Sequence, residues 1–452
     1  MAEALVAPFS ETVIRIGVTG LARSGKTVFI TSLVANLLDR GRMGQFSPAS
    51  RIEAAYLLPQ PDDTVPRFDY ETHLSAITGP KPHWPDSTRA VSELRISLKV
   101  RPAGLLAGIS GARTVHIDIV DYPGEWLLDL GLLDKSFEAW SAETLERMAK
   151  RNEASAFLAT LRETDPAQTH SEQQAQALAR DYTAYLHAAR AAGFSDCTPG
   201  RFLMPGELEG SPVLTFSPLP LSAHPRGSLA REMARRFEAY KAQVVRPFFR
   251  DHFSKVERQV VLVDVLGAIH ARPEAVEDLR RAMADTLSAF RPGANAWLSR
   301  LMGARRVERI LFAATKADHL HHSQHNRLTA IMEALVRQAR DRADFAGAKT
   351  GALAIASLRA TVEQTIPHAG RDLDCVRGTL LENGKQAAFY PGELPEDPNA
   401  VLGPARDGGR EWTDTDWKVM RFAPAALTLK PGEGPPHIRL DRAAEFLLGD
   451  RL

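Results

Sequence analysis

The hydrophobic positions of the chain form short runs that alternate with longer segments of helical spacing. Residues 13–19 (VIRIGVT) are rich in β-branched side chains, and residues 28–38 follow with apolar positions three and four apart. The first pattern predicts a buried strand and the second a helix. Strands that alternate with helices predict an α/β fold around a mixed sheet. Further strand-like runs lie at 93–100, 114–120, 259–265, 307–314 and 351–357.

Two of these runs lie close enough together to form a hairpin. Residues 93–100 (ELRISLKV) alternate polar and apolar side chains, and a glycine-containing span separates them from 114–120. We predict that the two runs pair antiparallel at the edge of the sheet. The preceding segment, 41–92, is long and irregular, and we interpret it as an insert because it carries many prolines: Pro48, Pro59, Pro61, Pro66, Pro80, Pro82 and Pro85.

The interval between residues 134 and 255 is mostly helical in pattern. Helical spacing covers 137–161, 168–192 and 227–255, and a stretch rich in proline and glycine at 198–221 resembles short strands. We interpret 134–255 as a helical domain inserted into the part of the chain that forms the sheet.

The remainder of the chain returns to the sheet and then changes character. Helical patterns are expected near 273–303 and 324–342, whereas residues 360–436 form short pieces punctuated by glycine and proline. We expect the amphipathic helix at 440–452 to return to the sheet. The predicted organisation is a core in two parts, 12–133 (with the insert at 41–92) and 256–359. A helical insertion, 134–255, separates the two parts, and a β-rich appendage with a C-terminal helix, 360–452, follows them.

The composition is that of an ordinary soluble globular protein. The chain has 452 residues with 56 Lys and Arg against 55 Asp and Glu. It lacks the basic excess typical of proteins that wrap nucleic acid, so we expect no nucleic-acid partner. Two cysteines cannot build a disulfide scaffold and indicate a reducing compartment. Without a signal-peptide pattern or a run of about 18 apolar residues, a cytoplasmic protein is expected.

A phosphate-binding motif stands between the first strand and the first helix. Residues 20–27 (GLARSGKT) match G-x-x-x-x-G-K-[ST] in the strand–loop–helix context that this motif requires. By chance the pattern would occur only ~0.02 times in a chain of this length. Its glycines let backbone N–H groups face phosphate oxygens, its lysine reaches the β- and γ-phosphates, and its threonine hydroxyl binds Mg²⁺. The predicted nucleotide-binding residues here are Gly20, Ala22, Arg23, Ser24, Gly25, Lys26, Thr27 and Val28.

A second motif follows the strand at 114–120. Residues 121–126 (DYPGEW) contain D-x-x-G, which in GTPases brings an aspartate near Mg²⁺ and a glycine amide to the γ-phosphate. Asp121 and Gly124 fit these roles. Glu125 stands where many GTPases have a glutamine that orients the attacking water. It is a candidate catalytic residue, and the alternative is a structural glutamate.

The third motif distinguishes guanine from adenine. Thr315, Lys316 and Asp318 form [NT]-K-x-D after the strand predicted at 307–314. The aspartate would accept hydrogen bonds from guanine N1–H and N2–H₂, and adenine presents neither donor. Thr315 replaces the commoner asparagine. Ser357, at the end of the run 351–357, is the candidate that presents a backbone N–H to guanine O6.

The pattern defines the third Mg²⁺ ligand less sharply than the first two. A threonine from the loop before the second sheet strand should join Thr27 and Asp121 at the metal. Our candidate for this metal-binding and catalytic residue is Thr88, and the alternatives are Thr64, Thr72 and Thr78.

Two further groups of residues have open interpretations. Arg23 and Arg89 could each supply an internal arginine finger, although either is more often a surface charge. Several histidines follow the third motif, and histidines can bind a metal. The pattern favours a helix start beside the base pocket instead. These histidines are His319, His321, His322 and His325.

Together these motifs resemble one family. GLARSGKT at 20–27, DYPGEW at 121–126, TKADHLHHSQH at 315–325 and the ending PHIRLDRAAEFLLGDRL are similar to the YcjX-like bacterial P-loop GTPases, over nearly the whole chain. The resemblance implies a Ras-like GTP-binding stress protein with a helical insertion. It also implies a membrane-associated protein partner, which would bring the protein to the inner membrane. Carried over by motif, it supports Lys26, Thr27, Asp121, Gly124, Lys316 and Asp318.

We therefore expect a protein that binds GTP and GDP with Mg²⁺, hydrolyses GTP to GDP and acts as a nucleotide-dependent switch. Lys26 and the loop amides would stabilise the phosphates electrostatically. The alternatives are an ATPase and a nucleotide-gated binding module with little turnover, which the glutamate at position 125 keeps open.

Overall fold

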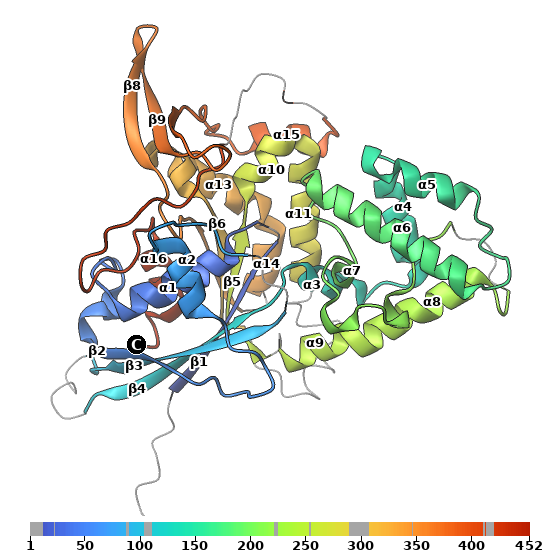
Figure 1. Ribbon diagram of the computed structural model, residues 1–452, viewed down its shortest axis with the longest axis horizontal. Coiled ribbons are helices and arrows are strands. Elements are labelled where there is room, and N and C mark those ends of the chain that lie inside the picture. Colours follow the sequence, from blue (N-terminus) through green and yellow to red (C-terminus); the bar gives the residue numbers. More distant parts are fainter. Residues whose placement is uncertain are drawn as a thin grey trace, which may run out of the picture.

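A seven-stranded sheet forms the centre of the protein (Figure 1). The computed structural model describes residues 12–21, 23–86, 90–103, 111–220, 225–252, 255–288, 307–345, 347–409, 412 and 420–452. The strand order is β2-β3-β4-β1-β5-β6-β7. The run from β4 to β7 is parallel, whereas β2–β3 and β3–β4 are antiparallel pairs. The strands are β1 (Thr12–Gly20), β2 (Ile52–Leu58), β3 (Ser92–Val100), β4 (Arg113–Asp121), β5 (Arg258–Val263), β6 (Arg309–Ala314) and β7 (Lys349–Ala354).

Helices cover both faces of the sheet. Val260 and Leu262 of β5 belong to one apolar cluster, and Val261 and Val263 belong to another, because successive side chains of a strand point to opposite faces. The predicted α/β fold around a mixed sheet is confirmed. The first cluster includes α1 (Lys26–Leu38) and α16 (Leu440–Leu448), and the second includes α10 (Val265–Ala271), α11 (Pro273–Ser288), α13 (His325–Leu335) and α14 (Arg337–Phe345).

The predicted hairpin forms, but it is not the edge of the sheet. β3 and β4 pair along their full lengths, from Ser92↔Asp121 to Val100↔Arg113. β2 pairs with the outer side of β3 and becomes the edge strand. Both β2 and α2 (Tyr70–Thr78) lie in the segment 41–92 that we expected to be irregular. Only Ile52 of β2 is buried, so the strand lacks the regular alternation by which a half-buried strand is recognised.

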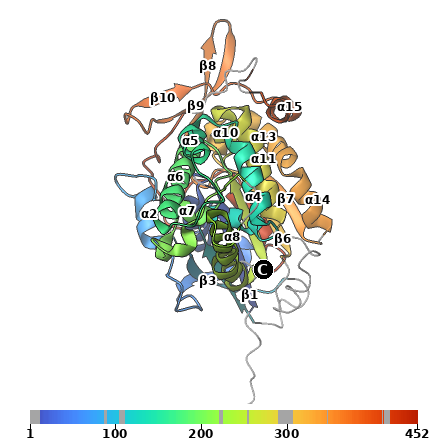
Figure 2. The same cartoon turned by 90° about the vertical axis from the view of Figure 1, so that its right-hand side faces the viewer.

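A helical unit, residues 125–251, lies to one side of the sheet (Figures 1 and 2). Trp140 is 1% exposed at its centre. Its ring stacks on Phe237 at a centroid distance of 5.0 Å, and Tyr182 and Phe216 meet it edge-on. The elements of the unit are α3 (Glu125–Leu128), η3 (Asp129–Leu132), α4 (Phe137–Met148), η4 (Asn152–Ala154), α5 (Ser155–Arg162), α6 (Glu172–Ala191), α7 (Gly200–Leu203), η5 (Gly206–Leu208), η6 (Pro212–Leu214), α8 (Leu229–Tyr240), the π-helical turn η7 (Lys241–Val245) and α9 (Arg246–Asp251).

Several helical patterns divide differently from the prediction. The strand-like pieces expected at 198–221 are wrong, because the described residues there form the short turns α7, η5 and η6. Gly200 begins α7 so close to α3 that an added Cβ would overlap the carbonyl oxygen of Glu125. The glycine thus allows close packing of two helical turns and does not mark a strand end. The patterns at 137–161 and 324–342 each form two helices, and the structure describes the helix expected at 273–303 only as far as Ser288.

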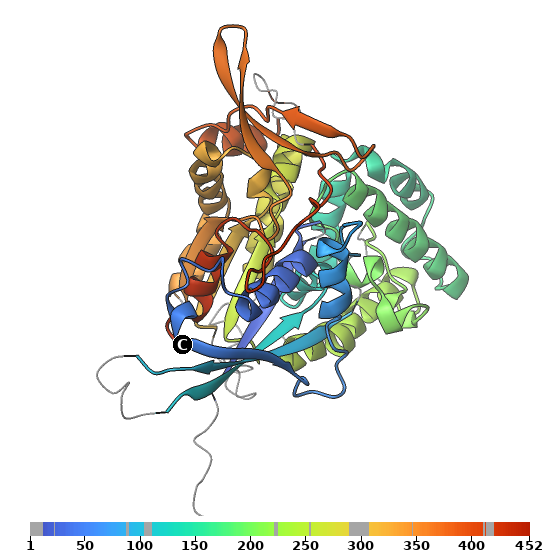
Figure 3. The same cartoon turned by 60° about the vertical axis from the view of Figure 1, so that its left-hand side comes forward.

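The C-terminal part adds a second, smaller sheet, as predicted. Its antiparallel strands lie in the order β10-β9-β8, and the β8–β9 hairpin projects from the body of the molecule (Figure 3). The chain then returns, and α16 packs into the apolar cluster that contains α1. Among the helices described, none is long and apolar enough to span a membrane. The elements of this part are β8 (Val362–His368), β9 (Arg371–Thr379), β10 (Gln386–Phe389), α15 (Asn399–Arg406) and α16.

A buried carboxylate joins three distant segments of the helical unit. Asp129 in η3 is 2% exposed. Its Oδ2 accepts a hydrogen bond from Tyr240 Oη at 2.5 Å, and its Oδ1 accepts one from the backbone N–H of Gly200 at 2.7 Å. Burial raises the pKa of Asp129 to about 7 from the ordinary value of 3.8, although these hydrogen bonds oppose the shift.

The raised pKa of Asp129 predicts a pH dependence of stability. Between about pH 4 and pH 7 the folded state keeps a proton that the unfolded state has lost, so stability from this group falls as pH rises through that window. The full loss is about 4 kcal/mol. Asp129→Asn preserves the shape of the side chain but cannot titrate. The stability of this variant relative to wild type should therefore be greater at pH 8 than at pH 4.5.

Urea unfolding of both proteins at the two pH values measures this difference. Asp181→Asn, at an exposed aspartate on α6, is the matched control and should follow wild type. A parallel pH profile for wild type and Asp129→Asn would contradict the raised pKa.

Candidate nucleotide-binding site

The phosphate-binding motif forms the loop between β1 and α1. Gly25 precedes α1 in the left-handed region, at φ 80°, where glycine alone carries no steric cost. Within the described residues no side chain caps the start of α1. The first amides and the positive end of the helix dipole are therefore suited to an anion. Of the predicted loop residues, Ala22 lies outside the described part of the chain.

Lys26 and Asp121 form a buried ion pair at this loop. Lys26 Nζ lies 2.7 Å from Asp121 Oδ1, and the two side chains are 9% and 2% exposed. The parallel register of β1 and β4 pairs Val18 with Asp121, so the two motifs meet although they are far apart in sequence. Thr27 follows Lys26 in the first turn of α1. A hydroxyl and a carboxylate are the oxygen donors that Mg²⁺ prefers, so Thr27 and Asp121 fit the predicted metal.

The DYPGEW segment lies directly against the phosphate loop. A Cβ added to Gly124 would overlap the carbonyl oxygen of Gly20, so no larger residue fits. Glu125 begins α3 and is 6% exposed. Its carboxylate pairs with the guanidinium of Arg190 at 2.9 Å. Arg190 comes from α6 in the helical unit, and no local pattern in the sequence marks it.

The third motif forms a braced turn after β6. Thr315 donates from its backbone N–H to the Val263 carbonyl at 2.9 Å, and its hydroxyl reaches the same oxygen at 3.3 Å. Thr315 thus braces the turn against β5. Lys316 adopts φ 63° and pairs with Asp264. Asp264 also caps α10 by accepting from the Gly267 N–H at 2.9 Å.

Asp318 is buried and is held from the C-terminal side. It is 4% exposed. Its Oδ2 accepts from the backbone N–H of Ala360 at 2.8 Å, and the Thr361 hydroxyl donates to its main-chain carbonyl. The start of the appendage therefore fixes the carboxylate that we predicted to read guanine.

One cavity of about 320 Å³ brings the motifs together. Its walls include residues from all three motifs and from the end of the run 351–357. Asp121 and Gly124 are not in its lining: Asp121 is buried beside Lys26, and Gly124 packs on the loop. Thr88 lies outside the described residues. The predicted residues that line the cavity are Gly20, Arg23, Ser24, Gly25, Lys26, Thr27, Val28, Glu125, Thr315, Lys316, Asp318 and Ser357.

The segment before Thr88 reaches the same cavity. Trp84, Pro85 and Asp86 line it. The alternative threonines are absent from its described lining, and the hydroxyls of Thr64 and Thr78 bond within their own turns, to Asp62 Oδ1 and the Leu74 carbonyl. Thr88 stays the predicted third ligand, and Arg89 also lies outside the described residues.

Trp84, His319 and Phe422 form an aromatic wall of the cavity beside the turn of the third motif, residues 315–318, which we call the base-reading turn. The sequence did not predict this wall as part of the site. Trp84 Nε1 donates to the Phe422 carbonyl at 2.7 Å, and His319 meets the Phe422 ring edge-on at 5.3 Å. Burial lowers the pKa of His319, which keeps its imidazole neutral. His319 lines the cavity, as expected for a histidine beside the base pocket. Further lining residues that the motifs do not mark are Leu21, Arg190, Met204, Ala356, Leu358, Leu381 and Arg421.

Comparisons with known proteins agree with the motifs. A family profile described as the YcjX-like family, DUF463, matches residues 14–452. A protein named Ras-like GTPase YcjX from Escherichia coli (strain K12) is 35% identical over an alignment of 461 positions. The alignment covers 97% of this chain and 96% of that protein. Another of the same name, from Shewanella oneidensis (strain MR-1), is 34% identical over 468 residues, which span 97% and 94%. The resemblance seen in the motifs is confirmed, and the chain belongs to the YcjX-like family.

Proposed function

We propose that the protein binds GTP with Mg²⁺, hydrolyses it to GDP and acts as a nucleotide-dependent switch. The observation that carries the proposal is one cavity lined both by the phosphate loop and by Asp318; these two parts of its wall are called the phosphate end and the base end. The two relatives described above are named Ras-like GTPases. An α/β sheet binds ligands at the carboxyl ends of its strands, and the three motifs follow β1, β4 and β6.

The phosphate end supplies positive charge from few groups. Lys26 would exchange its contact with Asp121 for the β- and γ-phosphates, and the amides at the start of α1 would bind their oxygens. Mg²⁺, when bound by Thr27, Asp121 and the predicted Thr88, would neutralise part of the phosphate charge. Water attacks the γ-phosphorus in line and GDP leaves, with electrostatic stabilisation as the main contribution.

The base end supports guanine over adenine. One oxygen of the Asp318 carboxylate is held by the Ala360 N–H, which orients the group and leaves acceptor capacity for guanine N1–H and N2–H₂. An adenine would offer no donor to the remaining acceptor positions of this buried carboxylate, which costs about 1–3 kcal/mol or more. This argument disfavours the ATPase alternative.

The switch proposal rests on where α3 is anchored. Gly124 touches the phosphate loop, and the residues after it, Trp126, Leu127 and Leu130, belong to the apolar core of the helical unit. A change at the γ-phosphate would therefore reach the helical unit through directly packed side chains. The resemblance implies a stress-linked role and a membrane-associated partner. We propose that this partner responds to the nucleotide-dependent state of the helical unit.

Two substitutions test the two ends of the cavity separately. Lys26→Ala should abolish nucleotide binding because it removes the lysine that would contact the β- and γ-phosphates. Asp318→Asn should weaken GTP binding and favour xanthosine triphosphate, because an amide can donate to the xanthine C2 oxygen. Competition against a fluorescent guanine nucleotide, with GTP, XTP and ATP as competitors, measures both effects.

The control for Lys26→Ala is Lys349→Ala, at an exposed lysine that begins β7. Unchanged GTP affinity in both site variants would contradict guanine-nucleotide binding in this cavity. Displacement by ATP equal to that by GTP would favour an ATPase, and single-turnover phosphate release distinguishes an enzyme from a binding module.

The Glu125–Arg190 ion pair generates a second prediction. Without Arg190, the buried Glu125 carboxylate would stand uncompensated on the cavity wall it shares with Lys26 and Thr27. Arg190→Ala should weaken GTP binding by at least about tenfold, or 1.4 kcal/mol, and should weaken GDP binding less because GDP lacks the γ-phosphate. Adding Glu125→Gln should restore much of the GTP affinity.

Titrations with both nucleotides measure this difference, with Arg180→Ala on the exposed face of α6 as the control. Equal losses for GTP and GDP, or no recovery in the double variant, would contradict charge compensation by Arg190. Slow phosphate release by wild type, combined with the predicted binding pattern, would favour the binding module with little turnover.

A further inference from the structure

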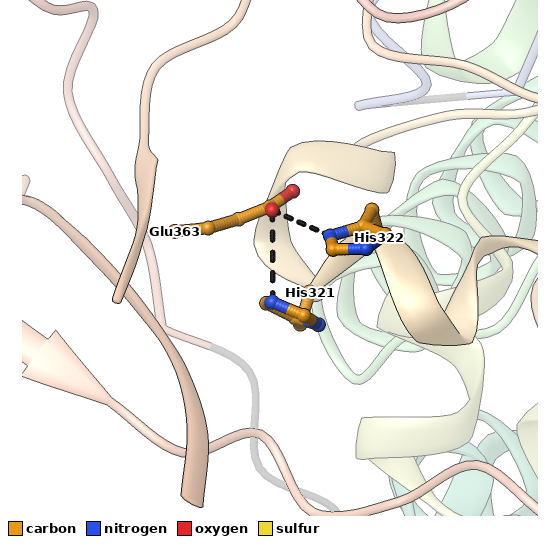
Figure 4. Close-up of side chains that lie close together, drawn as sticks. All are labelled: His321, His322 and Glu363. Atoms are coloured by element: carbon orange, nitrogen blue, oxygen red, sulfur yellow. Dashed lines mark hydrogen bonds and ion pairs between the residues drawn. The ribbon is translucent and has the colours of Figure 1, made fainter. Parts of the chain in front are cut away.

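Two consecutive histidines and a glutamate form a cluster beside the base-reading turn. His321 and His322 lie between Asp318 and α13, and Glu363 lies in β8 of the appendage. Figure 4 shows both imidazole rings directed at the Glu363 carboxylate. The cluster lies outside the described lining of the nucleotide cavity.

The three side chains converge at metal-binding distances. His322 Nδ1 lies 2.7 Å and His321 Nε2 lies 3.6 Å from Glu363 Oε2, and one ligand atom from each residue lies within 4.8 Å of the others. Around a tetrahedral ion with Zn–N and Zn–O bonds of about 2.0–2.2 Å, ligand atoms stand about 3.4 Å apart. The two N···O distances of 2.7 and 3.6 Å lie on either side of that spacing.

A second carboxylate orients His321 in the manner of a metal-bound histidine. Asp374 Oδ2 lies 3.2 Å from His321 Nδ1, and Ser323 Oγ lies 2.9 Å from the same nitrogen. The backbone N–H of Ser323 also lies 3.4 Å from this nitrogen. With the Nδ1 proton donated to Asp374, His321 directs the lone pair of Nε2 towards Glu363. Metal-binding histidines commonly donate their other ring N–H to a carboxylate, which fixes the tautomer and the ring orientation.

The charges of the cluster also suit a divalent cation. The ring centroids of His321 and His322 are 4.2 Å apart, so protonation of both would set two positive charges close together. With neutral imidazoles, Glu363 and Asp374 contribute two negative charges to the cluster, and Arg359 lies 3.7 Å from Glu363.

We propose that His321, His322 and Glu363 bind a divalent transition-metal ion such as Zn²⁺, with Asp374 as the residue that positions His321. Two imidazoles and one carboxylate are ligands that Zn²⁺ accepts, with a water in the fourth position. The ion would join the turn after Asp318 to β8. Ala360 and Thr361, which hold Asp318, immediately precede this strand. The metal therefore stabilises the contact between the appendage and the base-reading turn.

Calorimetric titration of the full, tag-free chain with ZnCl₂, without nucleotide, tests the site. Wild type should take up one equivalent in a saturable step. His321→Ala/His322→Ala should lose this step, Glu363→Gln should weaken it, and Asp374→Asn should weaken it by about 10–100-fold. His368→Ala, at an exposed histidine on the same strand, should bind as wild type does. Co²⁺ in place of Zn²⁺ should give the visible absorption of a tetrahedral site.

Equal zinc uptake by wild type and the double histidine variant would overturn the proposal. Zinc uptake lost equally in His368→Ala, or no Co²⁺ absorption from wild type, would also overturn it and would leave the histidines as partners in ordinary ion pairs. Circular dichroism of each variant checks folding, and Glu363→Gln preserves side-chain shape if the double variant is unstable. Because the substituted residues lie outside the described lining of the nucleotide cavity, the outcome is independent of whether the protein binds GTP.

Discussion

The segment that follows β4 is fixed at both ends, and the nucleotide site and the helical unit both depend on it. The Tyr122 hydroxyl donates to Gln259 Oε1 of β5 at 3.0 Å. Gly124 packs so closely on Gly20 that no side chain fits between them. Two residues after Gly124 the chain is inside the aromatic core, where Trp126 Nε1 donates to the Met204 carbonyl at 3.1 Å. Because close-packed interiors transmit displacement, the phosphate loop and the helical unit are mechanically linked through this segment.

Charge pairing explains how a nearly neutral protein can bind a highly charged ligand. The Lys26–Asp121 pair is buried, and the buried carboxylate of Glu125 is paired with the partly exposed guanidinium of Arg190, since an isolated buried charge is costly. A triphosphate with Mg²⁺ would replace Asp121 as the partner of Lys26 within the proposed site, whereas Arg190 would stay paired with Glu125. One lysine, one metal ion and backbone amides then suffice, and no basic surface is needed. The near balance of 56 basic and 55 acidic residues is consistent with such a site.

The sequence predicted the parts of the site that are local in the chain. Lys26, Thr27 and Asp318 belong to motifs in which spacing alone sets the geometry, because a strand end and a helix start determine where each residue points. Arg190, Trp84 and Phe422 reach the cavity only through tertiary packing. Their neighbours in sequence follow no phosphate- or base-binding pattern, so no local signal distinguishes them from ordinary surface or core residues. β2 was missed for a related reason, since an edge strand need not bury alternate residues.

Identification of the nucleotide that the purified protein carries tests guanine binding most directly. Denaturation of the protein, followed by anion-exchange chromatography of the released small molecules, distinguishes GDP and GTP from ADP and ATP. We predict a guanine nucleotide, retained in the presence of Mg²⁺ and absent from Lys26→Ala. Release of an adenine nucleotide, or no bound nucleotide together with no uptake of added GDP, would contradict guanine binding.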